Sequence, residues 1–191
     1  MRILVPGFAS LMLTALAGCQ PQASVPVPAA VSRYDAQITI RELMDAEVDP
    51  SADALWDAVT FNATLAGATA ERPHTAEQWQ ALRRRALTLV ESTNLIVMEG
   101  RQIAPPDTPV GLGELAPRES QRRLDANRAA FIGFAQALRG VSLEALDAID
   151  ARDAQRLFDV GGKIDQACEA CHLVYWYPPD ASQPTGSSNK P

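Results

Sequence analysis

The chain of 191 residues has few side chains that bind transition metals or form disulfides, with three cysteines and two histidines. Three of these five side chains, Cys168, Cys171 and His172, fall in one short segment. Only one other cysteine and one other histidine remain, so four ligands for a closed zinc site are hard to assemble. An excess of positive charge is also lacking, since 17 lysines and arginines stand against 23 aspartates and glutamates. The resulting formal net charge of −6 argues against nucleic acid as a partner.

The sequence contains no evident internal repeat and no convincing alternation of apolar and polar residues, the pattern typical of half-buried strands. Its hydrophobic residues, 47% of the chain, recur instead at three- and four-residue spacing, which is typical of amphipathic helices. With 21% charged residues, the composition is that of a globular domain that can bury a sizeable core. We therefore expect an all-α fold.

One segment carries the chemistry that the rest of the chain lacks: Cys168-Glu169-Ala170-Cys171-His172, with the spacing CxxCH. This spacing is typical of c-type haem attachment, in which two thiols form thioethers with the haem vinyl groups and the histidine binds the iron. Residues three and four positions apart share one side of a helix, so Cys168, Cys171 and His172 are expected to lie together. We expect one covalent haem c per chain, held by these three residues.

A thiol–disulfide pair is the alternative for Cys168 and Cys171. Such a pair usually opens a helix directly after a strand. Here the motif lies near the end of a helical pattern, and no strand pattern precedes it. Haem attachment is therefore the favoured interpretation.

Four helical patterns follow one another in a domain predicted to span residues 36–177. They cover residues 36–63, 75–100, 118–149 and 154–176. The first is interrupted by Asp49-Pro50-Ser51, where we expect a kink, and a Pro- and Gly-rich connection at 101–117 precedes the third. The expected fold is an antiparallel four-helix bundle with a C-terminal CxxCH haem site.

The N-terminal residues are predicted to be a targeting segment rather than part of the fold. Arg2 precedes an apolar stretch, residues 3–16, that is too short to span a bilayer, and the segment ends Leu16-Ala17-Gly18-Cys19. This ending resembles the lipobox of bacterial lipoproteins, so we expect residues 1–18 to be a signal peptide and Cys19 to carry lipid. An ordinary secretory signal is the alternative, and both place the protein outside the cytoplasm.

Residues 19–35 are expected to form a lipidated, Pro- and Ala-rich tether, and residues 178–191 a disordered polar tail. Gln20, by resemblance to the sorting of Gram-negative lipoproteins, implies anchoring in outer-membrane lipid on the periplasmic side. All three cysteines would then be used, one by lipid and two by haem, which suits an oxidising compartment.

The last helical pattern, from Asp153 to His172 with the pair Gly161-Gly162 before the motif, resembles the last helix of the class II cytochromes c. This family comprises cytochrome c prime and its low-spin relatives, which are four-helix bundles with haem near the C-terminal end. The resemblance covers about residues 36–177, but only the last helix is specific. It implies a monohaem cytochrome, not an enzyme, that exchanges single electrons with redox partner proteins and can form a homodimer.

The family resemblance also implies a sixth ligand on the first helix, which is methionine in electron-transfer members. Met44 lies in the first helical pattern, so Met44 and His172 would be the axial pair; a simple core position is the alternative for Met44. In gas-binding members a non-ligating apolar residue stands there, and binding of a small gas such as nitric oxide is the alternative function. Met98 and His74 are weaker ligand candidates.

Several other side chains are singled out. By the same resemblance, Arg41 is expected to meet a haem propionate. Tyr175, Trp176 and Tyr177 follow the histidine closely and are expected near the haem edge or in an exposed docking patch. The run Arg83-Arg84-Arg85 is expected to form a solvated helix face, with partner docking or propionate contact as the alternative.

Overall fold

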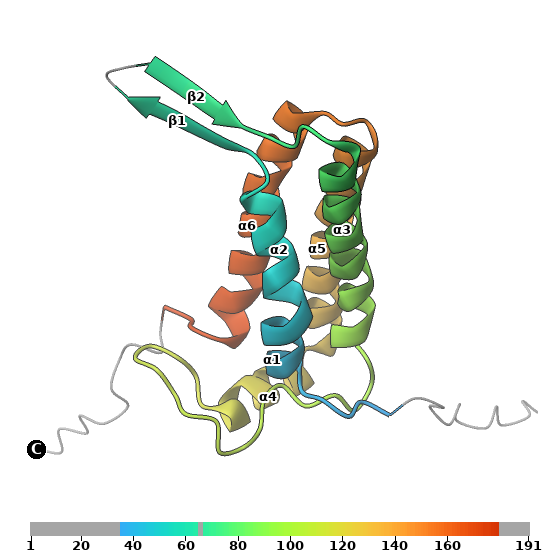
Figure 1. Ribbon diagram of the computed structural model, residues 1–191. Coiled ribbons are helices and arrows are strands. Elements are labelled where there is room, and N and C mark those ends of the chain that lie inside the picture. The colour runs from blue at the N-terminus through green and yellow to red at the C-terminus, as the bar shows by residue number, and fades with distance from the viewer. Residues whose placement is uncertain (1–34, 65–66, 180–191) are drawn as a thin grey trace, which may run out of the picture. The chain divides into compact units, whose positions relative to one another are not determined.

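A computed structural model describes residues 35–64 and 67–179 of the chain (Figure 1). The predicted signal peptide, the lipid site Cys19, the tether up to residue 34 and the tail from residue 180 lie outside the described residues. The elements are, in order, α1 Ile40–Leu43, the π-helical turn η1 Met44–Val48, α2 Asp49–Trp56, β1 Thr60–Thr64, β2 Gly67–Glu71, α3 Ala76–Ile96, α4 Pro117–Ala126, α5 Arg128–Asp150 and α6 Ala154–Tyr175.

The described part is mainly helical, as expected. Helix α5 packs antiparallel to both α3 and α6, and α2 packs against α3 and α6, so these four helices run side by side as a bundle (Figure 1). The start of α3 follows the prediction, because Thr75 and Gln78 form a capping box: the Thr75 hydroxyl accepts from the Gln78 amide, and the Gln78 side chain accepts from the Thr75 amide. The predicted last helix is also confirmed, as α6.

The first helix is shorter than predicted, because it begins after the Thr39 cap and ends at Trp56 instead of residue 63. Strands β1 and β2 pair antiparallel, with Thr60 opposite Glu71 and Thr64 opposite Gly67. The absence of strands was therefore a wrong expectation. Threonine and phenylalanine favour a strand at Thr60–Thr64. The strand was missed because an apolar pattern over so few residues fits a helix as well as a strand.

The interruption predicted at Asp49-Pro50-Ser51 takes the form of a π-helical turn directly before it. The Asp49 amide donates to the Met44 carbonyl, five residues back, and α2 then begins with Pro50 in its first turn. Proline has no amide proton to donate, so it is tolerated in this first turn. The result is an irregular turn that contains Met44.

The third predicted helix is broken into two. Asn127, with φ −147° and ψ 64°, ends α4 and caps α5, since its side chain accepts from the Ala130 amide at 3.1 Å. Asparagine is a favoured N-cap residue because its side-chain oxygen accepts one of the free amides of the first turn. The apolar spacing continues across the break, which is why the sequence predicted one helix.

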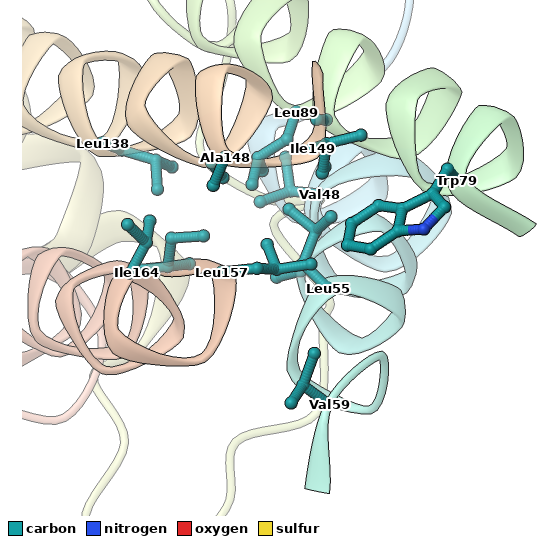
Figure 2. Close-up of a cluster of buried hydrophobic side chains, with 14 residues drawn as sticks. Val48, Leu55, Val59, Trp79, Leu89, Leu138, Ala148, Ile149, Leu157 and Ile164 are labelled. Atoms are coloured by element: carbon teal, nitrogen blue, oxygen red, sulfur yellow. The ribbon is translucent and has the colours of Figure 1, made fainter. Parts of the chain in front are cut away.

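Two clusters of buried side chains form the core. The hairpin-side cluster (Figure 2) contains Val48, Ala52, Leu55, Val59, Trp79, Ala86, Leu89, Leu138, Ala145, Ala148, Ile149, Leu157, Val160 and Ile164. The cavity-side cluster contains Ile40, Leu43, Ile96, Leu124, Phe131, Ala135 and Tyr175. Met44 packs against both clusters, Cys168 against the first and Cys171 against the second. The predicted site residues therefore lie where the clusters meet.

Candidate functional site

A pocket that is partly open to solvent lies beside the cavity-side cluster, and its empty space of about 790 Å³ includes the open mouth. Its walls come from α1 and η1, from the connection between α3 and α4, and from the end of α6. Sites for small molecules and cofactors are usually concave and have mostly apolar walls. The residues that line this cavity are mostly apolar, so it has the character of such a site.

Three of the predicted site residues line this cavity together: Met44 from η1, and Cys171 and His172 from α6. Cys168 lies one turn earlier on α6 and packs against the hairpin-side cluster; among the described residues it is not part of the cavity wall. Residues three positions apart on a helix are neighbours, so both thiols still lie on the same side of α6. Helix α6 thus places Cys171 and His172 at the cavity wall and Cys168 one turn away from it.

Both thiols are half-buried and free. Burial raises the pKa of Cys168 to about 11, with Asp49 and Asp165 adding to the effect, and raises the pKa of Cys171 to about 12. Thiols of disulfide oxidoreductases have the opposite property, a lowered pKa that makes the thiolate available at neutral pH. The alternative of a catalytic dithiol is therefore disfavoured here.

His172 is half-buried at the cavity wall. Burial lowers the pKa of its imidazole, an effect partly opposed by the carboxylates of Asp49 and Glu169. The imidazole is therefore neutral at neutral pH, which is the state that binds a metal through a ring nitrogen. The edge of its ring meets Trp176, with ring centres 4.9 Å apart and planes at 87°.

The chain folds back over His172 after α6 ends. The amides of Trp176 and Tyr177 both donate to the His172 carbonyl, at 2.8 and 3.0 Å. Tyr177 also donates its hydroxyl to Glu169, and burial together with this bond raises its pKa to about 12. Tyr175, by contrast, is buried and makes edge contacts with Phe131. Two of the three predicted aromatic residues thus surround His172, and the third is part of the core.

The connection between α3 and α4 forms the outer wall of the cavity through residues such as Ile103 and Val110. It is tied to α1, because the Arg41 amide donates to the Ile103 carbonyl, and to α6, because the Leu115 amide donates to the Trp176 carbonyl at 2.7 Å. The sequence predicted only a long connection here. Its length was the available signal, since long ordered loops in compact domains are often functional.

Arg41 lines the cavity, and its guanidinium lies 5.9 Å from the centre of the Trp176 ring. The predicted contact of Arg41 with a haem propionate stays a prediction. Asp49, the first residue of α2, also lines the cavity, and burial raises the pKa of its carboxyl. Asp49 was not predicted as a site residue, because it lies in the Asp-Pro-Ser interruption, whose sequence indicates only a kink.

The weaker ligand candidates lie elsewhere in the described part of the chain. Met98 follows α3, and its sulfur accepts from Arg101 at 3.3 Å. His74 is exposed, and its backbone amide donates to Gln78 before α3. Neither residue is among those that line the cavity. Arg83 makes a surface ion pair with Asp150, as a solvated helix face would.

The donor set fits a covalently attached haem: two thiols on one side of a helix, a neutral imidazole, and a thioether on the cavity wall. Among residues 35–64 and 67–179, no group of three or more His, Cys, Asp and Glu side chains is arranged to hold a metal ion by itself. The sequence matches no family model, no curated protein and no solved structure. The functional interpretation therefore depends on the site itself.

Proposed function

We propose that the chain is a monohaem c-type cytochrome that transfers single electrons. The observation that carries this proposal is the convergence of Met44, Cys171 and His172 on one mostly apolar cavity, with Cys168 one helical turn before Cys171. Each residue type matches one requirement of the cofactor: thiols for attachment, imidazole and thioether for ligation.

Each residue has a separate role. Cys168 and Cys171 would attach the haem covalently, His172 would supply one axial nitrogen, and Met44 would supply a sulfur ligand. When bound, the haem supplies reversible one-electron chemistry, and a methionine ligand raises its reduction potential. The mostly apolar walls of the cavity would surround the haem and limit its contact with water. Arg41, which also lines the cavity, would pair with a propionate.

A close contact joins the end of α2 to α6. The indole nitrogen of Trp56 donates to the Gly161 carbonyl at 2.9 Å, and a Cβ atom at Gly161 would lie 3.2 Å from Trp56 Cδ1. Glycine therefore permits this approach. The contact holds the helix that follows Met44 against the helix that carries His172.

Gas binding at a five-coordinate haem is a second candidate function. One observation favours it: Met44 packs against both hydrophobic clusters, as a residue of the core would. In that case Met44 stays away from the metal and leaves one position for a small ligand such as nitric oxide. The spectroscopic test of Met44 described in the Discussion distinguishes the two functions.

We further propose that Cys19 anchors the protein in lipid on the periplasmic side of the outer membrane, where it meets redox partner proteins. The sequence Leu16-Ala17-Gly18-Cys19 supports this location. Replacing Cys19 by alanine is expected to move the protein from the membrane fraction to a soluble or uncleaved form. An unmodified N-terminus downstream of Cys19, found by mass spectrometry of the mature wild-type protein, would contradict it.

The test of the cytochrome proposal is the mode of haem attachment. Protein exported from a host that matures c-type cytochromes should keep its haem through acid–acetone extraction and give a c-type pyridine haemochrome spectrum. The matched control is the Met98→Ala variant, which keeps the motif and should behave as wild type. Haem that is extracted completely, or no haem at all, would overturn the proposal.

A further inference from the structure

A short chain of hydrogen-bonding groups leads from the surface to His172. Tyr177 donates its hydroxyl to Glu169 Oε2 at 2.6 Å, and the Tyr177 hydroxyl oxygen lies 3.4 Å from His172 Nδ1. Glu169 is inside the Cys-x-x-Cys segment, and Tyr177 is reached by the turn that follows α6. Nothing in the family resemblance or in the motif assigns a role to either residue.

The protons of the three hydrogen-bonding groups, Glu169, Tyr177 and His172, have one consistent arrangement. A carboxylate can only accept hydrogen bonds, so the single hydroxyl proton of Tyr177 is directed to Glu169. A lone pair of the Tyr177 oxygen is then free to accept the proton on His172 Nδ1. The other ring nitrogen, Nε2, is left with its lone pair available to a metal.

We propose that Glu169 and Tyr177 are positioning residues for His172, which hold its ring in the Nδ1–H tautomer and increase electron donation from Nε2. This inference rests on the proposed haem function. Histidine ligands of metals commonly donate their second ring N–H to a carboxylate, carbonyl or water, and such partners fix ring orientation and raise ligand basicity. Here a tyrosine transmits the effect of the carboxylate.

The local backbone supports this role. The amides of Trp176 and Tyr177 both bond to the His172 carbonyl, so the residue that contacts the ring is held by the backbone of the histidine itself. Trp176 meets the same ring by its edge. The imidazole is therefore restrained by two neighbouring aromatic residues, and Tyr177 is the one that offers it an oxygen. Asp49, from α2, is the other carboxylate whose charge acts on His172.

The experiment compares holoproteins that carry Tyr177→Phe, Glu169→Gln or Asp165→Asn. Tyr177→Phe keeps the ring and removes the oxygen, so the reduction potential should rise. Glu169→Gln should raise it less, because an amide oxygen still accepts from Tyr177. Asp165→Asn is the matched control: it removes one charge, four residues before Glu169 on α6, and Asp165 influences Tyr177 through its charge alone.

A second measurement reports on the hydrogen bond itself. In the reduced wild-type protein, NMR should show a His172 Nδ1–H proton that exchanges slowly with solvent, and this exchange should become faster in Tyr177→Phe but not in Asp165→Asn. If haem is covalent and Tyr177→Phe changes neither potential nor exchange more than Asp165→Asn does, the inference is overturned while the cytochrome assignment stands. A wild-type protein without covalent haem overturns both.

Discussion

The two hydrophobic clusters of the bundle contain similar apolar residues but are completed in different ways. The hairpin-side cluster is filled mainly by aliphatic side chains from α2, α3, α5 and α6, together with the aromatic Trp79 (Figure 2). The cavity-side cluster has fewer residues, includes Phe131 and Tyr175, and borders the cavity that Met44, Cys171 and His172 line. Packed interiors normally leave few voids. The first cluster therefore secures the bundle, and the second borders the candidate site.

The largest expected effect comes from removing both thiols. In Cys168→Ala/Cys171→Ala, covalent haem should be lost completely and the cavity end should be poorly folded, because a bound group that fills it no longer contributes to stability. Haem content after acid–acetone extraction and helicity by circular dichroism measure the two effects. A double variant that keeps non-extractable haem would show that the thiols are not the attachment points.

The second comparison tests the packed cluster alone. Leu157 is 1% exposed in the hairpin-side cluster, so Leu157→Ala should lower the free energy of unfolding by about 2–5 kcal/mol. Leu173, on the same helix but 38% exposed, is the matched control, and Leu173→Ala should change stability by at most about 0.5 kcal/mol. Denaturant unfolding measures both. The visible spectrum should stay that of wild type in each variant, since neither side chain lines the described walls of the cavity.

The third comparison concerns the sulfur ligand. Wild-type ferric protein is expected to be low-spin and to bind carbon monoxide slowly or not at all. Met44→Ala should make the iron high-spin and lower its reduction potential, because the thioether is lost. Met98→Ala, whose sulfur bonds to Arg101 instead, should leave the spectrum unchanged.

Two results would contradict the role of Met44. A wild-type protein that is already five-coordinate and takes up carbon monoxide rapidly would favour the gas-binding function. A low-spin spectrum that persists in Met44→Ala would require another ligand. His74 and Met98 would then have to reach the iron, although neither lines the cavity.

The smallest effect tests the close contact between Trp56 at the end of α2 and Gly161 on α6. Gly162→Ala meets open space and should stabilise α6 by up to about 1 kcal/mol, since alanine favours helix over glycine. Gly161→Ala gains the same propensity but brings a Cβ to 3.2 Å from Trp56, and overpacking typically costs about 1–3 kcal/mol. The Gly161 variant should therefore be the less stable of the pair by about 1–3 kcal/mol in denaturant unfolding. Equal stabilities would mean that Trp56 moves aside freely.

The sequence predicted best those features that depend on neighbouring residues. Examples are the Thr75 capping box and the last helix, on which the residues of the CxxCH motif share one side. Hydrogen bonds and side-chain positions within a few residues determine both features. The pairing of Thr60 with Glu71 was missed, because pairing energy comes from a partner segment and leaves little mark on either strand. The break at Asn127 was missed because the apolar spacing runs through it.

The sequence singled out Met44, Cys171 and His172, which line one cavity, but not the surroundings of these residues. Cys171 and His172 are identified by their spacing, and Met44 by resemblance. The contacts of Glu169 with Tyr177 depend on how the chain turns after α6, a tertiary feature that no short pattern encodes. The same holds for the outer wall from Ile103 to Leu115, since its position depends on bonds to α1 and α6.

The placement of the two thiols has a consequence for how the molecule unfolds. Cys168 packs on one hydrophobic cluster, Cys171 on the other, and Met44 on both. A single group bonded to both sulfurs would connect the clusters, so that neither could open without straining the other. Thermal melting monitored at the site and in the far ultraviolet should then give one cooperative transition with a shared midpoint.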